Sequence, residues 1–140
     1  MTGRQGPPGP APLSPPLAEA MAEVTAPGVR FGHRQHIHLA FLAARRYGAD
    51  RTPEVMCDWI RQVAAAHGMP ERYHATMTIA WARIVAGHVS ADPSIGDFAA
   101  FADAYPPLLD KNLLARHYRP ATLSSADARA GWVAPDLAAI

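Results

Sequence analysis

Apolar residues along the chain recur three or four positions apart, which is the spacing of one face of an α-helix. This spacing predicts five helices, at about residues 32–47, 52–67, 73–89, 92–105 and 108–117. Glycine or proline lies close to the ends of these segments, where it stops or starts a helix. A last turn is predicted at 126–130, capped by Ser124 or Ser125. Because no segment alternates like a strand, we expect an all-α, single-domain bundle of about five helices.

The N-terminal residues lack this spacing. Residues 1–16 hold six of the fourteen prolines together with three glycines, and they offer no apolar face to bury. A short helical turn fits within 17–23, before Pro27 and Gly28 interrupt it. We therefore predict a disordered Pro/Gly-rich tail at 1–17 and a helical domain at 18–140.

Two histidines lie on the predicted inner face of the 32–47 helix. At about 100° per residue, His33 and His36 share this face with apolar side chains, whereas His38 turns away from it. Side chains three residues apart stand on adjacent turns and can converge on one point. Because imidazole exchanges protons near neutral pH, this face is suited to acid–base chemistry.

A third inward histidine, His74, begins the 73–89 helix. The hydroxyl of Thr78 lies one turn further and can orient the imidazole ring or a substrate. Trp81 on the same face, with Tyr73 beside it, offers a flat lining for an aromatic ligand. We therefore predict four catalytic residues, His33, His36, His74 and Thr78, and assign Tyr73 and Trp81 to substrate binding.

Two other interpretations of the three histidines stay open. Three neutral imidazoles that leave a fourth position free form a ligand set for zinc or copper. Neither an HExxH motif nor a cysteine pair accompanies them, so we predict no cofactor and keep zinc or copper on His33, His36 and His74 as the alternative. The structural interpretation is that each ring only bonds a backbone carbonyl in the core.

A cationic cluster ends the 108–117 helix. His117 continues the apolar stripe of Leu109 and Leu113, while Arg116 lies off that stripe and can bind a carboxylate or a phosphate. We assign Arg116, His117 and Tyr118 to substrate binding. The alternative is that these cations only complement the negative end of the helix dipole.

The composition of the chain limits the classes of partner and the cellular compartment that we expect. The formal net charge is +1 with no cationic block, so we expect a small-molecule substrate and neither nucleic acid nor a membrane. The single cysteine, Cys57, excludes an internal disulfide, and the absence of a signal-like or membrane-length apolar run predicts a cytoplasmic protein. Leu39 and Leu42 turn away from the histidine face and need a cover, which a homodimer or a larger enzyme would supply.

Four motifs occur in a fixed order, FxHxxH at 31–36, YHxTxTxAW at 73–81, LLDKxLLxRHY at 108–118 and ARxxWVxPD at 128–136. Over about residues 29–137 they resemble a widespread family of small bacterial helical proteins, and the chain is similar to its Pictet–Spenglerases of the streptonigrin type. The resemblance implies an enzyme of natural-product metabolism that condenses an aromatic amine or amino acid with a carbonyl compound. The family pattern has serine where this chain has Arg119, which implies a different anionic group on the substrate.

The implied chemistry agrees with the residues, because condensation needs an acid to expel water and ring closure needs a base. A three-histidine metal enzyme remains the first rival. The second rival is a non-catalytic binding or accessory protein, in which the histidines only hydrogen-bond a ligand.

Overall fold

The computed structural model describes residues 12–140, which form an all-helical domain with no strand among them. Five helices have seven residues or more, namely α1 (Pro15–Val24), α2 (His33–Tyr47), α3 (Thr52–Ala66), α4 (Ala75–Ala91) and α5 (Phe98–Ala104). The predicted all-α bundle of about five helices is thus confirmed. Within these residues no helix is both long enough and apolar enough to cross a membrane.

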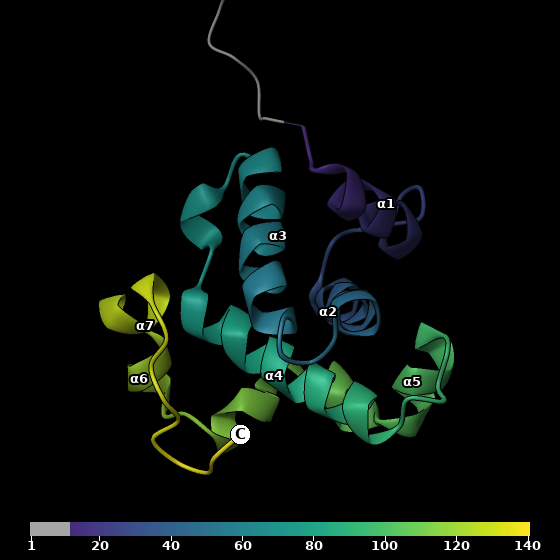
Figure 1. Cartoon of the computed structure of the whole chain (residues 1–140). Helices are drawn as coiled ribbons and strands as arrows, with labels where there is room; N and C mark the ends of the chain where they lie inside the picture. The colour runs from purple at the N-terminus through teal and green to yellow at the C-terminus, as the bar shows by residue number, and fades with distance from the viewer. Residues whose placement is uncertain (1–11) are drawn as a thin grey trace, which may run out of the picture.

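Short helices complete the chain. A 3₁₀ helix, η1 (Pro70–Arg72), joins α3 to α4, and four short helices follow α5, namely η2 (Pro106–Leu109), η3 (Lys111–Arg116), α6 (Pro120–Leu123) and α7 (Ala126–Ala130). In Figure 1, α6 and α7 lie beside the first half of α4, and α5 lies beyond its other end. The two ends of α4 therefore face different surroundings.

Helix α2 lies at the centre of the domain and packs against α1, α3, α4 and η2. It is consequently buried on most sides, and Ile37, Leu39 and Ala40 are each 0 % exposed. The prediction that Leu39 turns outward and needs a partner to cover it is wrong, because the chain itself covers this side chain. Leu42 stays half-buried.

Local signals fix the ends of α2 and α3. Gly48 and Gly68 follow these helices with positive φ angles of 86° and 71°, a conformation that favours glycine. Thr52 begins α3, and its hydroxyl donates to the Gly48 carbonyl at 2.8 Å. The predicted bounds of both helices agree with the structure to within one residue.

The predicted 108–117 helix is wrong, because the structure has the two 3₁₀ helices η2 and η3 there. Asp110 interrupts the helical backbone, because its ψ angle is 107°, a value typical of β structure. Its carboxylate accepts the backbone N–H of Asn112 at 2.9 Å. The predicted 92–105 helix also begins later than expected. Asp97 caps α5 by accepting the N–H of Ala100 at 2.9 Å, so the helix starts at Phe98.

The predicted disordered tail at 1–17 needs a correction at its end. Residues 1–11 lie outside the described part of the chain, whereas Pro15, Pro16 and Leu17 belong to α1. Proline is tolerated in the first turn of a helix, and Leu17 is 0 % exposed in the core. The helical domain therefore extends at least to Pro15.

The C-terminal segment, residues 131–138, is held by hydrogen bonds to elements far away in the sequence. The Thr76 hydroxyl donates to the Gly131 carbonyl at 2.8 Å and accepts the Val133 N–H at 3.0 Å. The Tyr118 hydroxyl donates to the Val133 carbonyl at 2.6 Å. Further along, the Leu137 N–H donates to the His117 carbonyl at 3.0 Å.

Candidate functional site

His33 ties α2 to η2. Its Nε2 lies 2.9 Å from the Leu108 carbonyl oxygen, and because that oxygen can only accept, Nε2 carries a proton. The ring meets Trp81 edge-on, with centroids 4.6 Å apart. Burial lowers the pKa of His33, and the bond to Leu108 opposes this shift. His33 is thus a neutral imidazole whose ring is held by other residues of the fold.

His36 is the predicted catalytic residue whose ring has a buried nitrogen without a partner among the described residues. Its Nε2 is buried without a hydrogen bond to any described residue. Burial, with a smaller contribution from neighbouring His33, lowers the pKa of His36 to about 4. The ring is therefore neutral around pH 7, and a buried polar atom of this kind normally has a hydrogen-bond partner in a folded protein.

The side chains of His74 and Thr78 form hydrogen bonds with the backbone at the start of α4. The Nδ1 of His74 accepts the N–H of Met77 at 3.1 Å and so caps the helix, while its Nε2 donates to the Leu123 carbonyl at 2.6 Å. The Thr78 hydroxyl donates to the His74 carbonyl at 2.7 Å. Both ring nitrogens and the hydroxyl are therefore occupied by the protein itself.

The three histidines proposed as alternative metal ligands do not form one cluster. Within residues 12–140, no group of three or more histidine, cysteine, aspartate or glutamate side chains is arranged to hold a metal ion. In addition, Nε2 of both His33 and His74 is bonded to a backbone carbonyl. This arrangement does not fit a zinc or copper centre on these residues.

The predicted substrate-binding residues are spread over the molecule. Trp81 and Tyr118 are 2 % and 0 % exposed, and the hydroxyl of Tyr73 is buried without a hydrogen bond in the described part of the chain. Arg116 and His117 instead line a surface groove described further below. Tyr73 lines another of the three surface grooves that we describe, a groove of about 620 Å³ between α1, α3 and η1. The predicted catalytic residues line none of the three, since His74 and Thr78 are buried and His33 and His36 are half-buried against neighbouring elements.

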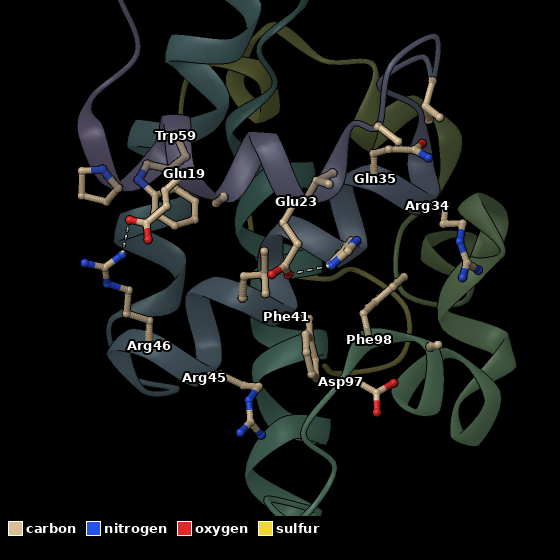
Figure 2. Close-up of a pocket in the computed structure, with 18 of the residues that line it drawn as sticks. Glu19, Glu23, Arg34, Gln35, Phe41, Arg45, Arg46, Trp59, Asp97 and Phe98 are labelled. Carbon is tan, nitrogen blue, oxygen red and sulfur yellow. Dashed lines mark hydrogen bonds and ion pairs between the residues drawn. The ribbon is translucent and has the colours of Figure 1, made fainter.

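The largest of these grooves, about 820 Å³, lies between α1, α2 and α5 (Figure 2). We call it the α1–α2–α5 groove. Its lining combines aromatic rings with charges of both signs, and includes Trp59, Phe98, Glu19, Glu23, Arg34, Arg45 and His38. His38 is the histidine expected to turn away from the site. A cavity of this size lies in the range of small-molecule sites, roughly 300–1,000 Å³.

His38 forms a pair with Glu23 in this groove. Its Nε2 lies 3.3 Å from a carboxylate oxygen of Glu23, and its ring stacks on Phe98 with centroids 4.3 Å apart and planes 5° apart. Because an ionised carboxylate only accepts hydrogen bonds, Nε2 carries the proton of the neutral ring. Nδ1 then has a free lone pair, which is the orientation of a histidine base held by a carboxylate.

The surroundings of His38 shift its pKa in opposite directions. Burial lowers the pKa of His38, the carboxylate of Glu23 raises it, and Arg34 lowers it further. Arg34 is placed by Phe98, since its guanidinium carbon lies 5.2 Å from the centroid of that ring. The net direction favours the neutral, base-competent form of His38.

Variants of these two neighbours are expected to move the pKa of His38 in opposite directions. Glu23→Gln removes the group that raises the pKa and should lower it, whereas Arg34→Gln removes a cation and should raise it. An NMR titration of the His38 ring protons measures both shifts. Arg119→Gln, which removes an arginine outside this groove, is the control. Shifts of the same sign in both variants would contradict the arrangement.

The residues of this groove were missed because they come from four separate helices, α1, α2, α3 and α5. The available signal was the spacing of Arg34, His38 and Arg45, which at about 100° per residue share the outer face of one helix. The packing of α1 and α5 over that face, which supplies Glu23 and Phe98, cannot be derived from local spacing.

Comparison with known proteins assigns no family to this chain. No protein-family model matches it, and neither a curated protein nor a solved structure is significantly similar to it. The family resemblance inferred from the four motifs therefore stays a prediction. What the protein does has to be argued from the geometry of the described residues.

Proposed function

We propose that the α1–α2–α5 groove binds a small aromatic amine or amino acid and that His38 acts as the acid–base group in its condensation with a carbonyl compound. The observation that carries the proposal is the His38–Glu23 pair in the largest groove, with Nε2 directed at the carboxylate and Nδ1 left free. The acid–base chemistry is the one predicted from the sequence, but it is assigned to this surface groove and not to the three histidines predicted to be catalytic.

The lining of the groove suits a zwitterionic aromatic ligand. The carboxylates of Glu23 and Asp97 attract an ammonium group, and the guanidinium of Arg34 can hold a carboxylate. Arg34 has no ion-pair partner among residues 12–140, whereas Arg45 already donates to the Ile95 carbonyl at 2.6 Å. Arg34 is therefore the arginine best placed to recognise the substrate.

The reaction needs no oxidant or reductant. The bound ammonium group first gives a proton to Nδ1 of His38, and the free amine nitrogen attacks the carbonyl carbon. The protonated His38 then returns this proton to the resulting hydroxyl, which leaves as water and produces an iminium ion. A carbon of the aromatic ring then attacks the iminium carbon and forms the new C–C bond. Nδ1 of His38 takes the proton from that ring carbon, which restores aromaticity, and later passes the proton to water.

His38→Gln is expected to lower the condensation rate by about 10²–10⁴-fold, because it removes the base. The rate is measured by mass spectrometry of the cyclised product formed from tryptamine or tryptophan with acetaldehyde. His67→Gln is the matched control, since it removes a histidine that lies outside this groove. Equal loss in both variants would contradict a specific role for His38.

A binding measurement separates the enzyme from the non-catalytic alternative. If His38→Gln keeps the affinity for tryptophan and loses turnover, the residue acts in the chemical step. If the wild-type protein binds tryptophan and forms no product with any aldehyde, the binding-protein alternative replaces the enzyme. Absence of both binding and turnover with aromatic amines would reject the proposal.

A further inference from the structure

A second groove, of about 520 Å³, lies between α4, η2, η3 and the C-terminal residues. We call it the α4–η3 groove. Much of its wall is apolar, from residues such as Ile84, Leu108 and Leu113. Ala139 and Ile140 form another part of the wall, and the bond from the Ala138 N–H to the Arg116 carbonyl, at 3.2 Å, holds this segment in place.

The polar side chains that line the α4–η3 groove are all basic. Arg83, His88, Arg116 and His117 contribute to it, and its lining contains no aspartate or glutamate side chain. The guanidinium of Arg83 also stacks on Trp132, with its central carbon 4.3 Å from the centroid of that ring. Neither arginine makes an ion pair with any residue in the described part of the chain.

The two histidines are oriented by backbone carbonyls. Nδ1 of His88 donates to the Ile84 carbonyl at 2.8 Å, and Nδ1 of His117 donates to the Ala138 carbonyl at 2.7 Å. In each ring Nε2 is left without a hydrogen bond to residues 12–140. Each ring can therefore turn a second N–H toward an anion when it is protonated.

We propose that the α4–η3 groove binds an amphipathic monocarboxylate, with the carboxylate between Arg83 and Arg116 and the hydrocarbon part along the apolar wall. Unpaired guanidinium groups at the edge of an apolar cavity complement this one class of ligand, because a neutral apolar molecule would leave them unused and a small inorganic anion would leave the wall uncovered. The proposal does not depend on the function proposed for the α1–α2–α5 groove.

Decanoate, used below its micelle-forming concentration, is the probe. We expect it to shift the ¹⁵N–¹H resonances of Gly87, Leu113 and Ile140, and we expect decanol to bind at least tenfold more weakly, because one charge-assisted hydrogen bond is worth about a factor of ten. Arg116→Gln should raise the dissociation constant of decanoate about tenfold. Arg119→Gln makes the same change of charge outside the groove and should leave that constant unchanged.

A groove-filling variant provides a second test. Gly87 lines the groove, and a Cβ built there meets no heavy atom within 4 Å, so Gly87→Leu should fold and block decanoate binding. Equal affinities for decanoate and decanol, or equal effects of Arg116→Gln and Arg119→Gln, would overturn the proposal. Binding to vesicles of anionic lipid without binding of free decanoate would overturn it in favour of a membrane surface.

Discussion

Lowering the pH from 6.5 to 4 is expected to remove about 3 kcal/mol of the free energy of unfolding through His36 alone. The ring titrates near 6.5 in the unfolded chain and near 4 in the folded one. Between these two values only the unfolded state binds the proton, so stability falls as the pH falls. Above this window both states are neutral and below it both are protonated, so His36 contributes no further change.

His36→Met isolates this contribution. Methionine is apolar, has a flexible side chain of similar volume and lacks the titrating ring, so urea unfolding at several pH values should show a smaller loss of stability on acidification than in the wild-type protein. At pH 7 the variant should be more stable by about 1 kcal/mol, because the buried, unpaired Nε2 is gone. Identical pH dependence in the two proteins would show that His36 is hydrated in solution.

Thr76→Val is expected to cost about 2–4 kcal/mol of stability. The Thr76 side chain is 0 % exposed, and its hydroxyl satisfies the Gly131 carbonyl and the Val133 N–H at once. Valine has nearly the same shape, so the change leaves two backbone groups unpaired without creating a large cavity. Urea unfolding measures the loss, and hydrogen exchange should show faster exchange at the amide of Val133.

Thr78→Val is the matched control on the same helix. Thr78 is also buried, but its hydroxyl donates to the His74 carbonyl, which already accepts the Thr78 backbone N–H at 3.1 Å. Removing it leaves no group unpaired, and we expect a cost below about 1 kcal/mol. Equal costs for the two variants would contradict the role assigned to Thr76 in holding the C-terminal segment.

The parts of the fold that local chemistry determines were predictable. Gly48 and Gly68 end α2 and α3 through their own backbone conformation, and Thr52 begins α3 with a hydroxyl that bonds one turn back. The 108–117 segment was not predictable from spacing, because the i, i+4 spacing of Leu109 and Leu113 indicates an α-helix and gives no sign of the break between them. There the Asp110 side chain competes locally for the backbone and breaks the helix.

The candidate site was predicted less well for a specific reason. The assignment of inner and outer faces assumed that the 32–47 helix would be covered on one side, whereas α2 lies between several elements. His33 and His36 are half-buried against neighbouring elements and line none of the described grooves, and Nε2 of His33 is bonded to the Leu108 carbonyl. His38, on the face assigned to solvent, forms part of a groove because α1 and α5 close over it.

The bonds that hold residues 131–138 have a consequence for synthesis of the chain. The two hydrogen-bond partners of the Thr76 hydroxyl follow it by 55 and 57 residues in the sequence, so they are synthesised after α4 is complete. Until those residues emerge, the Thr76 hydroxyl lacks its two partners and the flank of α4 against which α7 packs is uncovered. We infer that a nascent chain stalled before residue 131 stays partly open and is a target for chaperones and proteases.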